Sequence, residues 1–474
     1  MVFSSVFFLI YFLPAFLAIY FITPAKFKNA ILLISSIAFY MWGAPKFIFA
    51  ILATTTVDFY FVALLDRSKT ESRRKLFLVL SLMLNVGMLF YFKYCNFFIE
   101  NFNHILNVAG VKEVHWVKIF LPIGISFYTF ESLTYVIDVY RKVHKPLRNF
   151  FQYQLYIILF PKLIAGPIIR YHEISDQIPD RSARDTIDNK LTGFYRFILG
   201  LSKKVIIANT MAALADKVFT SDLYHLNTPM AWMGMLAYAF QIYFDFSGYS
   251  DMAIGIGKML GFKFPENFDN PYTSGSITEF WRRWHMTLGS WMKNYLYIPL
   301  GGNKVSARRL YINLWVVFVI SGFWHGASWT FIFWGVYHGV LLVLERLFLL
   351  RLYRKLPKFI PVIVTFLLVC IGWVFFRADH FKDAYHILRS LTSFNFEINY
   401  IFINNFTVFV MVLAAILSFF TLTKIGKGIQ DRIYYFNEKG LHYLPATIGS
   451  ICLFYFCLAA ISAGTFNPFI YFRF

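Results

Sequence analysis

Residues 358–376 read KFIPVIVTFLLVCIGWVFF and have the composition that sets the fold class of this chain. The one charged residue of this stretch stands at the first position, and nearly all of the others are apolar. A helix of about 20 such residues is long enough to cross the hydrocarbon core of a membrane. The stretch therefore predicts a transmembrane helix.

Comparable apolar runs recur along the whole chain, which has 474 residues, of which 58% are hydrophobic and 15% charged. Soluble domains carry about 25% charged residues. We expect an all-α, polytopic membrane protein with about 11–13 transmembrane or re-entrant helices around a central funnel. The predicted segments are 3–23, 28–43, 46–65, 76–97, 117–139, 150–169, 228–247, 309–325, 327–349, 358–376, 404–421 and 444–463.

The net charge of +20 comes from basic residues in short loops between the apolar runs, such as 67–75 and 350–358. Loops of this kind mark the cytoplasmic side of a membrane protein. The loops at 43–46, 98–116 and 377–403 are less basic for their length. This alternation predicts that both termini lie on the outer side, and it excludes nucleic acid as the expected partner.

The middle of the chain, residues 171–303, does not fit simple spanning helices. Residues 171–209 are polar and predict amphipathic helices in the membrane interface. Glycines, prolines and charges then interrupt residues 249–303, and irregular backbone at membrane depth is tolerated only where protein or a wet cavity surrounds it. We expect re-entrant helices there, within a single membrane domain that covers residues 1–474 and has a catalytic core at 278–341.

His285 follows Trp281, Arg282, Arg283 and Trp284 within this core. On a continuous helix from about Ser276, Trp281 and Leu288 would share its face. A histidine in apolar surroundings costs free energy unless it has a partner or a task. An interfacial helix with tryptophan and arginine anchors and a structural histidine explains the spacing equally well.

His325 stands between Trp324 and Gly326, with Gly322 shortly before it. The glycines permit a helix break or a close approach of the backbone to a ligand. A neutral imidazole at such a place can accept a proton from a hydroxyl nucleophile. The alternative for His325 is a histidine that packs between helices and bonds a neighbouring carbonyl group. For His338, which lies on a predicted continuous helix four residues after Trp334, a satisfied packing histidine is favoured.

Two carboxylates, Asp245 and Asp251, close an apolar run. They indicate a hydrogen-bond network around the funnel rather than a metal site, because no further carboxylate or histidine completes a ligand set. The four cysteines, at positions 95, 370, 452 and 457, have no metal-binding spacing either. We expect no metal and no bound cofactor.

Three long motifs carry a family resemblance: YFDFSGYSDMAIG at 243–255, FWRRWHMTLGSWMKNYLYIPLGGNK at 280–304 and SGFWHGASWTFIFWGVYHG at 321–339. Together they resemble the membrane-bound O-acyltransferase (MBOAT) family. The similarity is greater to its bacterial branch that acetylates alginate. The family's two histidines correspond to His325 and His285, which the resemblance implies are catalytic.

The resemblance implies a fold and an activity. Such proteins take an acetyl group from a cytoplasmic donor, here acetyl-CoA, across the bacterial inner membrane. A separate periplasmic partner of the SGNH-hydrolase type completes its transfer to an exported polysaccharide such as alginate. Arg282 or Arg283 could stabilise the developing oxyanion or bind donor phosphates, and Lys304 could also bind phosphates. The candidate substrate contacts are Arg282, Arg283, Trp281, Trp324, Asp245 and Lys304.

Other functions fit parts of the pattern. The same chemistry can act on peptidoglycan, cellulose or teichoic acid, although the IPLGGNK sequence at 298–304 favours the polysaccharide branch over teichoic acid D-alanylation. A polytopic transporter without chemistry would also contain broken helices and buried charges. That function predicts inverted repeats, which are not evident in the sequence, and no dependence on His325.

Overall fold

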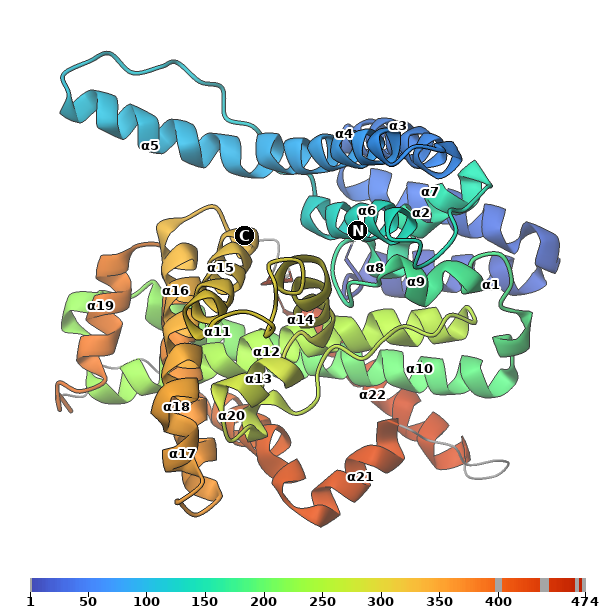
Figure 1. Ribbon diagram of the computed structural model, residues 1–474. Helices are drawn as coiled ribbons and strands as arrows, with labels where there is room; N and C mark the ends of the chain where they lie inside the picture. Colours follow the sequence, from blue (N-terminus) through green and yellow to red (C-terminus); the bar gives the residue numbers. More distant parts are fainter. Residues whose placement is uncertain (1, 397–402, 435–442, 465–468, 471–474) are drawn as a thin grey trace. The chain divides into compact units, whose positions relative to one another are not determined.

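The computed structural model describes residues 2–396, 403–434, 443–464 and 469–470, and part of the predicted loop at 377–403 lies outside them. Within this described part the only regular secondary structure is helical, which confirms the predicted all-α class (Figure 1). The chain forms two compact units: unit 1 comprises Met1–Lys190 and Ile256–Pro265, and unit 2 comprises Leu191–Gly255 and Glu266–Phe474. A single membrane domain stays a prediction.

Helices long and apolar enough to cross a membrane make the chain an integral membrane protein. The described residues contain seven of them, and a shorter apolar helix spans Phe8–Ile22. The decisive stretch at 358–376 corresponds to α18, Phe359–Arg377. The seven are Phe47–Arg67, Glu71–Val108, Ile187–Phe219, Trp329–Tyr353, Phe359–Arg377, Asn405–Leu422 and Tyr443–Ala463.

Unit 1 is built mainly from helices in the first third of the chain. Within it, α3 packs against α4, α4 against α6, and α2 against α7. Asp58 of α3 accepts hydrogen bonds from Ser81 and Asn85 of α4 and from Tyr153 of α7, which joins these helices. The helices are α1 Leu13–Ile22, α2 Lys28–Gly43, α3 Phe47–Arg67, α4 Glu71–Leu89, α5 Cys95–Val108, α6 Ile125–Tyr140, α7 Phe150–Ile158, α8 Phe160–Leu163 and α9 Tyr171–Ile174.

The helix predicted at 117–139 begins later, because residues 117–124 are not helical. Pro122 lacks a backbone N–H group, and Gly124 adopts a left-handed conformation with φ 79° just before α6. A Cβ atom on Gly124 would lie 2.6 Å from the carbonyl oxygen of Leu163. Glycine is therefore required both by the turn and by the close approach of the neighbouring chain.

Unit 2 contains the remaining helices, and within it α16 packs against both α15 and α18 (Figure 1). The helices are α10 Ile187–Ser202, α11 Asn209–Phe219, α12 Thr228–Met259, α13 Ile277–Arg283, α14 Met286–Trp291, α15 Ala307–His325, α16 Trp329–Leu344, α17 Leu350–Tyr353, α18 Phe359–Arg377, α19 Phe381–Ser390, α20 Asn405–Phe419, α21 Lys424–Tyr434 and α22 Tyr443–Ala463. The first residues of α10 and the last residues of α12 belong to unit 1.

Residues 187–219 differ from the predicted interfacial helices. They form α10, a π-helical segment at Lys203–Ala208 and α11, which together are long enough to span a membrane. Two basic residues of this segment, Lys203 and Lys204, are paired with carboxylates of α12. Lys203 lies 2.7 Å from Asp251, and Lys204 lies 2.9 Å from Asp245. Their charge is thus neutralised inside the unit.

Candidate active site

A break in the helix at Trp284 and His285 corrects the continuous helix that the spacing predicted. Helix α13 ends at Arg283, and α14 begins at Met286. Between them His285 adopts a left-handed conformation with φ 44°. The chain around Asn267 pairs the backbone groups of the break: Met286 N–H donates to Asn267 O at 2.9 Å, and Asp269 N–H donates to Arg283 O at 2.9 Å.

The start of α13 is held by side chains on both sides. The Ser276 hydroxyl accepts a hydrogen bond from the Glu279 N–H at 3.1 Å, as an N-cap. The buried carboxylate of Glu345, which follows α16, accepts bonds from the N–H of Ile277 and from the N–H (2.9 Å) and hydroxyl (2.7 Å) of Thr278. These bonds fix the short helix that leads to His285.

His285 is a buried, neutral base with one nitrogen engaged. Its Nδ1 lies 3.0 Å from the side-chain oxygen of Asn267, and its ring packs against Phe246 with 4.6 Å between ring centroids. Its Nε2 has no hydrogen-bond partner among the residues that the structure describes. Burial lowers the pKa of His285, which lies outside the seven candidate spans, to about 3. The imidazole is therefore uncharged near neutral pH.

A cavity of about 560 Å³ opens beside His285 in unit 2. This volume falls within the range of small-molecule sites, about 300–1,000 Å³. Most of its wall is apolar or aromatic, and its lining cations are Arg282, Lys293 and Arg346. All three are exposed. The lining also includes Thr278, Trp281, Trp284, Ser290, Tyr297, Asn303, Leu314, Val317, Phe318, Ser321 and Leu342.

The neighbouring arginines have different environments. The Arg283 guanidinium donates to Glu279 at 2.5 Å and to the Thr273 hydroxyl at 2.8 Å, so its charge is already paired. Arg282 is exposed and lines the cavity. Of this pair, Arg282 is the residue placed to bind an anionic group of a ligand.

His325 is the last residue of α15 and is 4% exposed. Its ring packs against Trp334 and Phe376, each with 5.3 Å between centroids. A Cβ atom on Gly326 would lie 2.3 Å from the ring of Phe331, so the turn after His325 requires a glycine.

Trp324 connects the two candidate histidines. Its ring centroid lies 4.9 Å from that of His325 and 6.3 Å from that of His285. Although His285 and His325 are far apart in the sequence, they belong to one aromatic cluster. Among the described residues, His285 and not His325 lines the cavity.

His338 is fully buried in the same unit. Its Nδ1 accepts a long hydrogen bond of 3.4 Å from the Trp281 indole, and its ring packs against Trp334. Trp281 in turn lines the cavity. His338 therefore packs behind the cavity wall. Its Nε2 has no hydrogen-bond partner among the described residues, so it is not the fully satisfied packing histidine that the sequence predicts.

Two predicted substrate contacts lie elsewhere. Asp245 is buried, pairs with Lys204 and accepts the Ile470 N–H at 2.9 Å, so it serves an internal network. Lys304 is exposed in the loop after Asn303. Neither residue is part of the described cavity lining. In the described part of the chain, no group of three or more histidine, cysteine, aspartate or glutamate residues could hold a metal ion.

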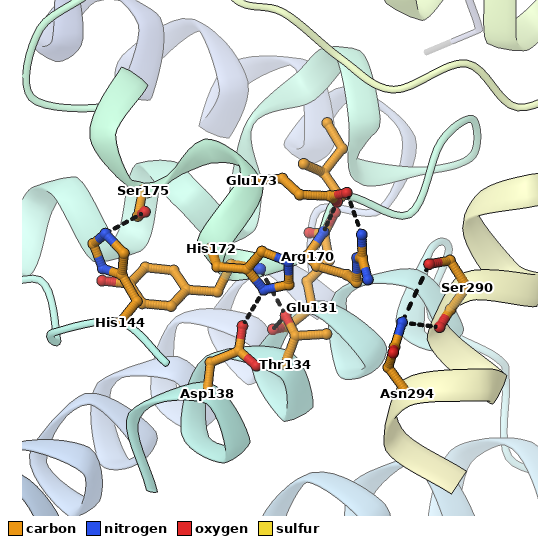
Figure 2. Close-up of polar contacts among 12 residues, drawn as sticks. Glu131, Thr134, Asp138, His144, Arg170, His172, Glu173, Ser175, Ser290 and Asn294 are labelled. Atoms are coloured by element: carbon orange, nitrogen blue, oxygen red, sulfur yellow. Dashed lines mark hydrogen bonds and ion pairs between the residues drawn. The ribbon is translucent and has the colours of Figure 1, made fainter. Parts of the chain in front are cut away.

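Several polar contacts carried no signal in the sequence. In unit 1, His172 Nδ1 lies 2.8 Å from Asp138, and the His144 ring bonds the Ser175 hydroxyl at 3.0 Å (Figure 2). In unit 2, the Asn294 amide donates to Ser290 of the cavity wall (Figure 2). Ser290 and Asn294 stand four residues apart, a spacing that places both on one helix face. The partners of His172 and His144 are far apart in the sequence, so no spacing identifies them. The same is true of Asn267, which bonds His285.

Comparison with known proteins places the chain in a family. The family model described as "MBOAT, membrane-bound O-acyltransferase family" matches residues 76–379. The chain is 38% identical to the probable alginate O-acetylase AlgI of Pseudomonas aeruginosa, over 100% of both chains. It is also 38% identical to a peptidoglycan O-acetyltransferase of Helicobacter pylori, over 83% of this chain and 80% of the relative. The chain belongs to the membrane-bound O-acyltransferase family.

Proposed function

We propose that the chain is an O-acetyltransferase that takes an acetyl group from acetyl-CoA and passes it to a hydroxyl group of an exported polysaccharide such as alginate. The observation that carries the proposal is the cavity of about 560 Å³ with a neutral histidine in its wall and cations at its lining. Full-length similarity to alginate O-acetylases supports the acetyl group and the acceptor.

The transfer is an acyl substitution. A hydroxyl oxygen attacks the thioester carbonyl carbon while a histidine removes the hydroxyl proton. The carbon–sulfur bond then breaks, and the departing thiolate takes up that proton. His285, whose Nε2 faces no protein partner in the described chain, is the base that lines the cavity. His325 acts as a second base or carries the acetyl group transiently. In the second case its ring nitrogen attacks the thioester carbonyl carbon, the carbon–sulfur bond breaks with release of the thiol, and the acceptor hydroxyl then takes the acetyl group from the imidazole.

The cations of the cavity suit the donor. Acetyl-CoA carries several phosphate charges, and Arg282, Lys293 and Arg346 provide exposed positive groups around one cavity. Charge-assisted hydrogen bonds to phosphate are among the stronger polar contacts. Arg282 is the principal donor contact in this proposal because no described residue takes its charge.

The acceptor lies on the opposite side of the membrane from the donor. CoA and a polysaccharide are both too polar to enter lipid, so the protein has to pass only the small acetyl group. A separate periplasmic protein of the SGNH-hydrolase type completes the transfer, and the chain resides in the bacterial inner membrane.

The cytoplasmic loops are those at 67–75 and 350–358. Single cysteines there should resist an impermeant thiol reagent in intact cells, and labelling of both would contradict this orientation.

Peptidoglycan is the second acceptor to test, since the Helicobacter relative bears the name of a peptidoglycan O-acetyltransferase. Cellulose and teichoic acid are further acceptors for the same chemistry. The teichoic acid D-alanyltransferase of Bacillus subtilis is 28% identical over 55% of this chain and 69% of the relative.

The test uses purified full-length protein in lipid vesicles, with labelled acetyl-CoA on one side and alginate, peptidoglycan fragments or cellulose on the other. An added periplasmic acetyltransferase serves as partner. His325→Ala should lower acetyl transfer by about 10²- to 10⁴-fold without reducing the amount of folded protein. Near-normal transfer by that variant would overturn the proposed mechanism. Substrate movement without acetyl transfer, unaffected by His325→Ala, would indicate a transporter.

A further inference from the structure

Asn267 is a buried residue whose side chain contacts the candidate base His285. This residue lies in the irregular segment that follows α12 and is 1% exposed. Its side-chain oxygen lies 3.0 Å from His285 Nδ1, 2.9 Å from the Thr287 hydroxyl and 3.4 Å from the Thr287 N–H. Its side-chain nitrogen donates to the Ser250 hydroxyl at 3.0 Å.

These contacts fix which end of the Asn267 amide faces His285. A backbone N–H group is always a donor, so the Thr287 N–H requires the amide oxygen on that side. The reversed amide would place its NH₂ group against this N–H. Met286 N–H also donates to the Asn267 backbone carbonyl at 2.9 Å, which holds the residue in register with the break.

The orientation of the amide determines the tautomer of His285. A neutral imidazole has one N–H donor and one acceptor nitrogen, and the hydrogen bond at one nitrogen sets the state of the other. Because the Asn267 oxygen can only accept, Nδ1 of His285 carries the proton. Nε2 then has the free lone pair, and His285 lines the cavity. Nε2 is also the atom that has no partner among the described residues.

We propose that Asn267 is a positioning residue that holds His285 as the Nδ1–H tautomer, so that Nε2 is the base presented to the substrate. The proposal rests on the acetyl transfer proposed above. The contact also explains why this position carries an amide. A carboxylate there would stabilise the charged imidazolium and so oppose the neutral base, whereas an amide oxygen orients the ring without adding charge. The charged groups that line the same cavity are Arg282, Lys293 and Arg346, all cationic.

Two substitutions distinguish a role of Asn267 in positioning His285 from a role in folding. Asn267→Ala removes the oxygen, so we expect kcat to fall by about 10²-fold, the lower end of a general-base contribution, with little change in the KM for the donor. Asn267→Asp keeps the acceptor oxygen and adds charge. We expect it to retain activity at high pH and to lose activity as the pH falls, because His285 then becomes protonated in a more alkaline range.

A matched control is Asn313→Asp. Asn313 is 1% exposed in the same unit, and its amide donates to the Leu300 carbonyl at 3.1 Å, not to a histidine. This variant introduces the same buried charge elsewhere. It should not shift the acid limb of the kcat–pH profile, whatever its effect on the yield of folded protein.

The tautomer itself is read by ¹⁵N NMR of full-length protein labelled with [¹⁵N]histidine in detergent, with His285→Gln identifying the signal. We expect Nδ1–H in the parent chain and in Asn267→Asp at high pH, and a mixed state in Asn267→Ala. An unchanged tautomer in Asn267→Ala would overturn the proposal. Loss of the Nδ1–H tautomer in Asn267→Ala with an unchanged kcat would also overturn it. The same holds if Asn313→Asp shifts the acid limb of the kcat–pH profile as far as Asn267→Asp does. Absence of acetyl transfer by the parent chain would refute the proposed function separately.

Discussion

Two buried polar networks, one in each unit, differ in how completely their groups are paired. In unit 1 Asp58 is fully buried, and both of its carboxylate oxygens accept hydrogen bonds, from Ser81, Asn85 and Tyr153. In unit 2 His285 is 1% exposed, and only one of its ring nitrogens is bonded within the described chain. In the first network both carboxylate oxygens are bonded by protein groups, whereas in the second the residue with an unbonded nitrogen lines a cavity.

The difference indicates which network serves stability and which serves chemistry. A buried polar atom without a partner costs about 1–3 kcal/mol, and at His285 that atom belongs to a residue that lines a cavity. The Asp58 network has no such open atom on its carboxylate and joins three helices. The His285 network pays this cost at the position where a substrate would arrive.

The largest expected effect is that of His285→Ala on catalysis. Removing the base should lower acetyl transfer by about 10²- to 10⁴-fold, while the melting temperature in detergent stays close to that of the parent chain. Labelled acetyl transfer in vesicles, normalised to folded protein, measures this. A folded His285→Ala protein with full activity would remove the distinction between the two networks.

Asp58→Ala should have the opposite profile. It leaves Ser81, Asn85 and Tyr153 with buried donors that lack their acceptor, which should lower the free energy of unfolding by roughly 1–3 kcal/mol. Acetyl transfer per folded molecule should remain unchanged. Thermal unfolding in detergent and the vesicle assay provide the two measurements. Lost activity in a fully stable Asp58→Ala protein would assign unit 1 a part in the chemistry.

Arg282→Ala and Arg283→Ala sharpen the comparison within one pair of neighbours. Arg282→Ala should raise the KM for the donor by about 10-fold or more, since a hydrogen bond to a charged group contributes roughly 1.5–3 kcal/mol. Arg283→Ala breaks its contacts with Glu279 and Thr273 and should chiefly lower thermal stability. Titration of acetyl-CoA at saturating acceptor distinguishes them, and the reverse pattern would contradict the assignment.

The smallest effect on activity is expected for His338→Ala. The long 3.4 Å bond from Trp281 is a neutral contact, and such contacts contribute about 0.5–1.5 kcal/mol, so transfer should fall by less than roughly 10-fold. The parallel assay of His285→Ala sets the scale. A loss as large as that of His285→Ala would make His338 part of the chemistry.

Helix positions that depend on local apolar pattern were predictable from the sequence. The segment predicted at 28–43 coincides with α2, Lys28–Gly43, and that at 358–376 differs from α18 by one residue at each end. Hydropathy decides such segments locally. The start of α6 was predicted too early because Gly124 and the distant Leu163 together determine it.

The sequence indicates candidate residues for the site but not their geometry. His285 and His325 are candidate catalytic residues and Trp324 is a candidate substrate contact from the sequence. The structure brings their three rings into one cluster, and of the three His285 lines the described cavity. The helix break at His285 was not expected, because its backbone groups are paired by Asn267 and Asp269 from another segment. Likewise, the partners that neutralise Arg283 and Asp245 come from tertiary packing, which periodicity does not contain.

The left-handed conformation of His285 lowers the stability of the protein while it keeps a histidine in the candidate active site. A residue with a Cβ atom costs about 1–2 kcal/mol at φ 44°, whereas glycine adopts this conformation freely and asparagine does so readily. Selection for heat resistance alone should therefore replace His285 by glycine or asparagine and leave a sturdier, inactive protein. A library screened only for survival on heating should lose the histidine at this position, and a screen that also requires acetyl transfer should keep it.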